Sequence, residues 1–198
     1  MITFIVGTDT NVGKTYIGTK LARNGYKVIK PIETGKETFN DIFESDSGQY
    51  AKIQNKNILD VNLYFFNKPM SPHISCKLDN IEIDLESIRK FILKHKEVYV
   101  ELAGGLMVPI TNNYTQLDLI KSIPNSEVLL VVDNKLGAIN HTLMNIEILK
   151  LNNIRLKDII FNDMNPDINQ DIKVSNKAII SYFNQNNWFI FAYCKSII

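Results

Sequence analysis

Short apolar runs that alternate with amphipathic helical patterns limit this chain to a small set of folds. Runs rich in β-branched and aromatic residues are found at 2–6, 26–30, 98–102, 128–133, 158–162 and 188–192. Most are continuously apolar, as expected of strands buried on both faces of a sheet. Helical patterns lie between them at 15–24, 84–95 and 139–151. We therefore predict a single-domain, three-layer α/β fold over 1–198, with a doubly wound, mainly parallel sheet.

Composition narrows the classes of ligand. The 198 residues carry a formal net charge of only +1, and the lysines are spread along the chain. This charge distribution does not favour binding to nucleic acid or to an anionic membrane. Cys76 and Cys194 lack the spacing of a metal site. We expect a soluble, cytoplasmic protein that binds small molecules.

Polar residues directly after the predicted strands are the best site candidates. In open α/β sheets, ligands bind outside the carboxyl ends of the strands. The segments that follow strand ends are 7–15, 30–35, 101–105, 133–141 and 162–166. We expect all of them to line one rim of the sheet.

The first of these segments, "GTDTNVGKT", ends like a phosphate-binding loop. The common GxxxxGKT pattern would need glycine at position 8, where this chain has Thr8 and offers Gly7 instead. A loop from a strand into a helix still directs backbone N–H groups and the positive end of a helix dipole at one point. We therefore predict a P-loop NTPase-like architecture, with Lys14 at the terminal phosphates and the Thr15 hydroxyl on Mg²⁺.

Magnesium also requires carboxylate ligands, and Glu101 and Asp46 are the best candidates. Glu101 ends an apolar strand and precedes a pair of glycines. Asp46 could instead cap the helix that follows it. Local sequence does not separate Asp46 from Asp41 or Glu44.

Lys30 ends the second apolar run, where a charged residue is unusual. At a strand end it would face the same rim as Lys14, and two ammonium groups suit phosphoryl transfer between anions. The alternative is a surface lysine on an edge strand.

Six segments in order along 7–163 together resemble the family of ATP-dependent dethiobiotin synthetases. They are "GTDTNVGKT" (7–15), "KPIETG" (30–35), "SPHIS" (71–75), "ELAGG" (101–105), "KLGAINH" (135–141) and "FND" (161–163). The family's own phosphate loop has the extra residue between its glycines. Only the first segment is specific by itself, but jointly they are a strong match.

The resemblance implies a role for each matching residue. Nucleotide binding is implied for Asn11, Val12, Gly13, Lys14, Thr15, Tyr16, Asp46, Glu101, Gly104 and Asn162. The implied Mg²⁺ ligands are Thr15, Asp46 and Glu101, and the implied catalytic residues are Lys30 and Lys14. Substrate contacts are implied for Thr34, Gly137, Ala138 and Asn140, the last three contacting the carboxylate tail of the substrate from the other subunit of a homodimer.

The implied reaction is the penultimate step of biotin biosynthesis. 7,8-Diaminopelargonic acid, CO2 and ATP would give dethiobiotin, ADP and phosphate. A carbamate and then a carbamic-phosphoric anhydride would form on the way.

Two departures from the family pattern bear on the site. Leu102 stands where the family has glycine, so we expect a bulky side chain beside the phosphate and metal region. The chain also ends at "WFIFAYCKSII", where the family pattern continues with a GxIPxL-like loop and a helix that helps hold adenine. We therefore expect a domain shortened at the C-terminus, with weakened selectivity for ATP over other nucleotides.

Three other protein classes share parts of this pattern. Partitioning ATPases carry a lysine five positions before the loop lysine, where this chain has Asp9. Amidotransferase ligases of cobyrinate synthesis carry an additional glutaminase domain, for which 198 residues leave no room. A degenerate binding protein that keeps the fold without turnover is the third alternative.

Overall fold

A five-stranded parallel sheet forms the centre of the molecule. The computed structural model describes residues 1–185, so the strand predicted at 188–192 lies outside the described residues. The sheet has the order β2-β5-β1-β8-β9, and every neighbouring pair is parallel. Its strands are β1 (Ile2–Gly7), β2 (Val28–Ile29), β5 (Val98–Glu101), β8 (Ser126–Asp133) and β9 (Arg155–Asn162). The predicted doubly wound α/β fold is confirmed, although β2 is shorter than the apolar run at 26–30.

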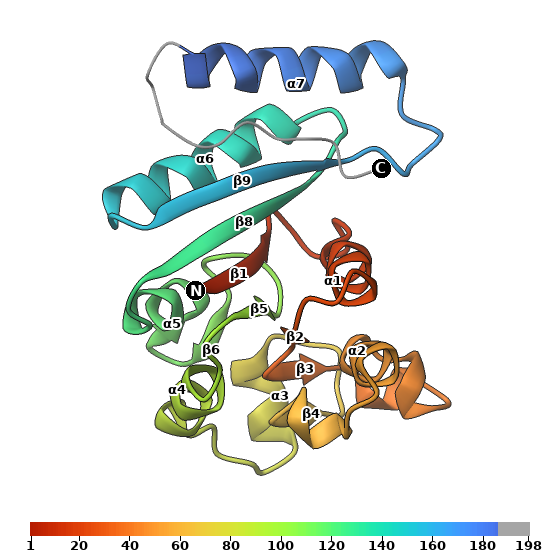
Figure 1. Ribbon diagram of the computed structural model, residues 1–198, viewed down its shortest axis with the longest axis vertical. Coiled ribbons are helices and arrows are strands. Elements are labelled where there is room, and N and C mark those ends of the chain that lie inside the picture. The colour runs from red at the N-terminus through yellow and green to blue at the C-terminus, as the bar shows by residue number, and fades with distance from the viewer. Residues whose placement is uncertain (186–198) are drawn as a thin grey trace.

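Helices cover both faces of this sheet. They are α1 (Lys14–Arg23), α2 (Asp46–Gln54), α3 (Pro72–Leu78), α4 (Leu85–Leu93), α5 (Gln116–Ser122), α6 (Ala138–Leu151) and α7 (Gln170–Gln185). The helices α1 and α2 lie on one side of the strands, and α4 and α5 lie on the other (Figure 1). No helix within residues 1–185 is long and apolar enough to cross a membrane.

Alternation along each strand separates the core into two layers. Phe4 and Val6 of β1 pack in the larger cluster, with apolar residues of α4, α5, α6 and α7. Ile5, between them, packs in the second cluster with Ile17 and Tyr50 of α1 and α2. This follows from the period of two along a strand, and it explains why the apolar runs are continuous.

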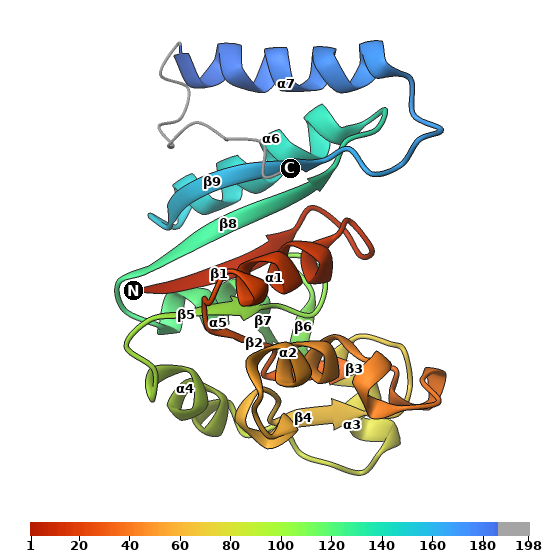
Figure 2. The same ribbon diagram turned by 45° about the vertical axis from the view of Figure 1, so that its right-hand side comes forward.

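Smaller elements extend the carboxyl edge of the sheet. Two short strands, β3 (Ile32–Thr34) and β4 (Tyr64–Phe66), form a parallel pair. This pair and α3 lie at the end of the molecule opposite α7 (Figure 2). The antiparallel pair is β6 (Pro109–Thr111) and β7 (Tyr114–Thr115), and the 3₁₀ turns are Lys36–Thr38, Ile42–Glu44 and Ile58–Asp60.

Candidate active site

A cleft of about 690 Å³ opens between the carboxyl edge of the sheet and the β3–β4 unit. It is lined by Thr10, Asn11, Gly13, Lys14, Thr15, Lys30, Thr34, Asp46, Pro69, Met70, Ser71, Pro72, Glu101, Ala103, Gly104 and Val108. Three of the five segments predicted to share one rim meet here, those at 7–15, 30–35 and 101–105. Ser71 and Pro72 of the "SPHIS" segment also line the cleft, although the sequence assigned them no role.

The loop after β1 leaves the N-terminus of α1 open to the cleft. Gly13 precedes α1 with φ +100°, and no side chain caps the first turn of the helix. The first backbone N–H groups are therefore available to an anion. A Cβ on Gly13 would lie 2.4 Å from Nδ2 of Asn162, so this position has room only for glycine.

Asn162 holds this loop from the end of β9. Its Nδ2 donates to the carbonyl oxygen of Val12 at 3.0 Å, and its Oδ1 accepts from the N–H of Met164. The amide is thus bonded to the chain at both ends. Val12 is buried beneath the loop and does not line the cleft.

Lys14 enters the cleft from the first residue of α1. It is buried, and its Nζ donates to the carbonyl oxygen of Asp9 at 3.1 Å. Burial lowers the pKa of Lys14, and the neighbouring Lys30 adds to this effect, whereas the charge of Glu101 opposes it. An ammonium held without a carboxylate contact has a strong electrostatic attraction for an incoming phosphate.

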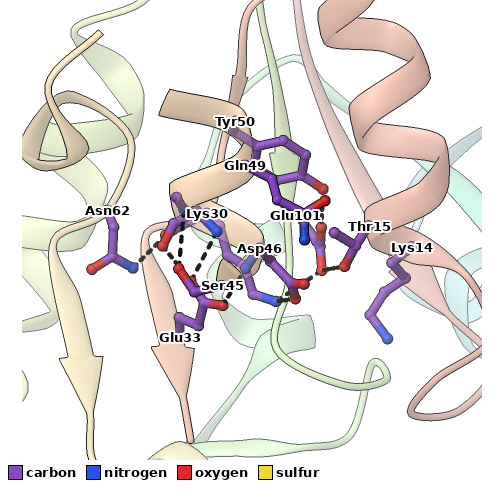
Figure 3. A network of polar contacts seen from close by, with 12 residues as sticks. Lys14, Thr15, Lys30, Glu33, Ser45, Asp46, Gln49, Tyr50, Asn62 and Glu101 are labelled. Atoms are coloured by element: carbon purple, nitrogen blue, oxygen red, sulfur yellow. Dashed lines mark hydrogen bonds and ion pairs between the residues drawn. The ribbon is translucent and has the colours of Figure 1, made fainter. Parts of the chain in front are cut away.

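The Lys30 ammonium lies between two carboxylates at the centre of the site (Figure 3). Its Nζ is 2.9 Å from Oε1 of Glu101 and also contacts Oδ2 of Asp46. Burial by itself would lower the pKa of Lys30, but the charges of Glu101 and Asp46 more than offset burial and raise it. Lys30 is only 7% exposed, so the alternative of a surface lysine is wrong.

Glu101 accepts three hydrogen bonds at the centre of the site. Its Oε1 accepts from Oγ1 of Thr15 at 3.1 Å as well as from Lys30. Its Oε2 accepts from the Tyr50 hydroxyl, which lies behind the cleft. Burial and then the charge of Glu101 raise the pKa of Tyr50 well above its ordinary value, so this hydroxyl remains a donor.

The carboxylate of Glu33 holds the helix that carries Asp46. Glu33 is buried and accepts from the backbone N–H groups of Asp46 at 2.8 Å and Ser47 at 3.0 Å, and from the Ser47 hydroxyl. A carboxylate at the first turn complements the helix dipole. Burial raises the pKa of Glu33 despite the nearby Lys30.

Sequence reasoning missed Tyr50 and Glu33. The signal for Tyr50 was its spacing of four residues from Asp46, which places both on one face of a helix. Glu33 lies inside the "KPIETG" segment, but its partners come from a helix that the segment does not specify. The predicted capping role of Asp46 is wrong, because Ser45 is the N-cap of α2 and its side chain accepts from Gly48 N–H.

The oxygen donors at the centre of the site fit a magnesium ion. Thr15, Asp46 and Glu101 present hydroxyl and carboxylate oxygens, and the Lys30 ammonium already occupies a cation position between the two acids. Within residues 1–185 no group of three or more His, Cys, Asp or Glu side chains could hold a metal. A Mg²⁺ ion here would rely on phosphate and water oxygens for its other ligands, as it commonly does in nucleotide sites.

The other residues named from sequence fall into two groups. Asn11, Thr34 and Gly104 line the cleft. Tyr16 lies on the exposed side of α1, with Nζ of Lys20 4.8 Å from its ring centroid.

The segment at 137–140 is not part of the cleft in the single chain. Gly137 has φ +90° and precedes α6, which follows β8 on the far side of β1 from the Lys30 cluster. Gly137 and Asn140 are exposed, Ala138 is buried, and none of them lines the cleft. As predicted, 133–141 shares the carboxyl rim with the phosphate loop, because β8 and β1 are parallel neighbours and the N–H of Thr8 donates to the carbonyl oxygen of Val131, but 137–140 lie outside the cleft of the single chain.

Leu102 does not crowd the phosphate region. Its side chain is 2% exposed and packs in the larger core cluster, while Glu101 before it faces the cleft. Alternation along β5 continues into residue 102, because the N–H of Leu102 still bonds to the carbonyl oxygen of Ile5. The expectation of a bulky side chain beside the phosphates is therefore wrong.

Comparisons with known proteins give a family match and distant structural likenesses. The model of a family described as AAA domain matches residues 3–188. Among solved structures, the signal recognition particle receptor FtsY from Elizabethkingia anophelis in complex with GDP is 16% identical, with a TM-score of 0.46. The match covers 88% of this chain and 53% of that chain.

Curated relatives give the family. An ATP-dependent dethiobiotin synthetase BioD from Francisella tularensis is 38% identical over 171 residues, which cover 80% of this chain and 76% of that protein. One from Legionella pneumophila is 35% identical over 173 residues, covering 83% of this chain and 81% of that protein. The cleft contains the lysines, carboxylates and open helix terminus that an ATP-dependent ligase requires. On these grounds, the chain belongs to the family of ATP-dependent dethiobiotin synthetases.

Proposed function

We propose that this enzyme closes a cyclic urea on 7,8-diaminopelargonic acid, using CO2 and ATP, to give dethiobiotin, ADP and phosphate. The observation that carries the proposal is the convergence of a phosphate loop, two buried lysines and two carboxylates in one cleft. Relatives named as ATP-dependent dethiobiotin synthetases support the choice of substrate.

The loop and α1 bind the phosphates of ATP in this proposal. The open N-terminus of α1 supplies N–H donors, and Lys14 supplies a positive charge without a competing carboxylate contact. Asn162 supports the loop by its bond to Val12.

Thr15, Asp46 and Glu101 would hold Mg²⁺ beside the phosphates. When bound, the ion would neutralise charge on the phosphate oxygens. Residues of this chain prepare the position: Glu33 fixes the start of α2, and therefore the backbone of Asp46.

The chemistry proceeds in three steps. One substrate amine attacks the carbon of CO2 and loses a proton, which gives a carbamate. A carbamate oxygen then attacks the γ-phosphorus of ATP, and the bond from that phosphorus to the bridging oxygen of ADP breaks. The second amine attacks the carbonyl carbon of the mixed anhydride, phosphate leaves, and the ring closes with loss of a proton.

Lys30 stabilises charge during the second step. Both reactants are anions, so their approach requires positive charge at the reacting atoms. Lys30 is protonated and lines the cleft between the phosphate loop and the β3–β4 unit. Lys30 and Lys14 are therefore the catalytic residues of the proposal.

The diamine binds at the end of the cleft away from α1. Thr34, Pro69, Ser71 and Pro72 line that part, and Thr34 offers a hydroxyl. We place the carboxylate tail of the substrate on Gly137, Ala138 and Asn140 of a second subunit in a homodimer, since the N-terminus of α6 has no side-chain cap.

The cytoplasmic location expected from the sequence stays a prediction.

Isotope incorporation tests this proposal directly. The purified protein is incubated with Mg·ATP, the diamine and ¹³C-bicarbonate, and the product is identified by mass spectrometry. We expect dethiobiotin with the label in its ureido carbon. A folded protein that binds ATP but gives no labelled dethiobiotin would contradict the proposal.

A further inference from the structure

We infer that Tyr50 is a positioning residue whose hydroxyl fixes the Glu101 carboxylate in the orientation that binds Mg²⁺. This inference rests on the proposed function, because it assigns a metal to Glu101. It concerns a residue behind the cleft that does not touch the space for substrate or nucleotide.

The two oxygens of Glu101 have separate partners. Oε1 lies 3.1 Å from the Thr15 hydroxyl and 2.9 Å from the Lys30 ammonium, both of which line the cleft. Oε2 accepts from the Tyr50 hydroxyl. Because Oε2 is held from behind, rotation of the carboxylate would break a buried hydrogen bond to a charged acceptor, which is costly. Tyr50 therefore keeps Oε1 directed toward Thr15.

The environment of Tyr50 supports a dedicated role for its hydroxyl. Tyr50 is 0% exposed and packs among apolar residues such as Ile17 and Val28. A phenylalanine would fill the same apolar space without a polar atom to satisfy. The hydroxyl is instead paired with a carboxylate that is itself only 1% exposed.

Gly18 on α1 provides the space for this hydroxyl. A Cβ at position 18 would lie 2.1 Å from the Tyr50 oxygen and 2.6 Å from its Cζ. Glycine in a helix interior is unfavourable relative to alanine, so its presence within α1 has a packing reason. That reason is the ring and hydroxyl of Tyr50.

Helix α2 links Tyr50 to a second metal ligand. Asp46 and Tyr50 are four residues apart, so they lie on one face of the helix. Asp46 contacts the Lys30 ammonium from that face, and Tyr50 contacts Glu101. One rigid element therefore sets the positions of both carboxylates.

The test measures metal binding apart from turnover. Mn²⁺ serves as the probe for the magnesium site, and its affinity is measured by electron paramagnetic resonance with a non-hydrolysable ATP analogue present. For Tyr50→Phe we expect affinity for Mn²⁺ about 10- to 100-fold weaker than in the wild-type protein, as for other groups that orient metal ligands. Affinity for the ATP analogue in EDTA should stay unchanged.

A matched control separates this effect from general loss of a hydroxyl. Tyr114→Phe removes a hydroxyl that donates to the carbonyl oxygen of Asp118 at 3.1 Å, outside the cleft. We expect it to leave Mn²⁺ affinity unchanged. In assays of dethiobiotin formation, Tyr50→Phe should need more Mg²⁺ for half-maximal rate, and saturating Mg²⁺ should restore most of the rate. A merely structural defect would not respond to added metal.

Gly18→Ala provides a second variant that keeps the tyrosine. Its new Cβ would lie 2.1 Å from the Tyr50 oxygen and must displace this buried side chain, so a native circular dichroism spectrum is required before metal binding is measured. We expect weaker Mn²⁺ binding here as well. Wild-type affinity for Mn²⁺ in a folded Tyr50→Phe protein would overturn the inference. Absence of Mn²⁺ binding in the wild type would overturn both the inference and the proposed metal site. If Mn²⁺ binding depends on Tyr50 but the protein forms no dethiobiotin, only the proposed reaction is wrong.

Discussion

The ammonium nitrogen of Lys30 lies 2.9 Å from Oε1 of Glu101, and both side chains are buried. Lys14 is equally buried in the same cleft, but its Nζ contacts a backbone carbonyl instead of a carboxylate. The two lysines are therefore buried to the same extent, but only Lys30 is paired with carboxylates. Comparing variants of the two lysines separates the effect of the ion pair on stability from the effect of each ammonium on turnover.

Replacement of each lysine by methionine should change stability differently. Lys30→Met leaves the carboxylates of Glu101 and Asp46 without their cation, so we expect the free energy of unfolding in EDTA to fall by about 3 kcal/mol. Lys14→Met removes a desolvated ammonium, and we expect a loss no greater than about 1 kcal/mol. Urea unfolding of both variants provides the measurement. Equal destabilisation would show that the ion pair with Glu101 does not contribute to stability.

Both variants should lose turnover. Removal of a group that stabilises developing charge typically lowers the rate by about 10²- to 10³-fold. We expect at least this loss for Lys14→Met and Lys30→Met, and also for Lys30→Ala. Steady-state rates of dethiobiotin formation, measured on protein with a native circular dichroism spectrum, test it. Near-normal turnover in a well-folded Lys30 variant would rule out the catalytic role.

Magnesium should partly replace the missing ammonium in Lys30→Met. The ammonium would then no longer compete with the metal for these two carboxylates, and a ligand that binds only the folded state raises its stability. We expect added MgCl2 to raise the free energy of unfolding of Lys30→Met more than that of the wild type. A KCl solution of matched ionic strength is the control for screening. An equal response of both proteins to MgCl2 would show that the Lys30 ammonium does not compete with the metal for Asp46 and Glu101.

Much of this architecture could be predicted from the sequence, because continuous apolar runs identify strands buried on both faces. The runs at 2–6 and 128–133 correspond to β1 and β8. The β3–β4 pair was not predictable in the same way. Each of its strands has three residues, too few for a periodic pattern, and their pairing depends on segments about thirty residues apart.

The site also combines residues that could be predicted from the sequence with residues that could not. Residues that follow strand ends could be located because the position rule depends only on strand order. Tyr50 and Glu33 could not, since both act through the docking of α2 against the sheet. Leu102 was misjudged because the family pattern has glycine there, while the direction of its side chain depends on alternation along β5.

Asn162→Ala should weaken the binding of all nucleotides by the same factor. The Asn162 amide bonds to Val12 and to the N–H of Met164, so we expect it to support the phosphate loop. Loss of one such bond corresponds to about tenfold weaker binding. Affinities for ATP, GTP and CTP provide the measurement, with Asn145→Ala on α6 as a matched control. A loss confined to ATP would instead identify Asn162 as a contact to the base.

Asp158 on β9 should make stability depend on pH. Partial burial raises its pKa to about 6. A carboxyl group whose pKa is raised on folding contributes stability below its unfolded pKa of about 3.9 and loses it as pH rises through the folded value. Asp158→Asn keeps an acceptor for the N–H of Ile159, so we expect it to match the wild type near pH 4.

Above pH 7 the asparagine variant should be the more stable protein. The difference should reach at most about 2 kcal/mol, because solvent screens a half-buried group. Urea unfolding across pH 4 to 8 measures it, with the exposed Asp167→Asn as control. A constant difference over this range would show that Asp158 titrates as an ordinary carboxyl group.

Phosphate release by the purified protein tests the central claim most directly. The protein is given Mg·ATP and bicarbonate, with and without 7,8-diaminopelargonic acid, and the series is repeated with GTP and CTP. We predict release that requires the diamine and matches dethiobiotin formed in a ratio of one to one. Release that is absent, or that is indifferent to the diamine, would contradict the ligase reaction proposed for this cleft.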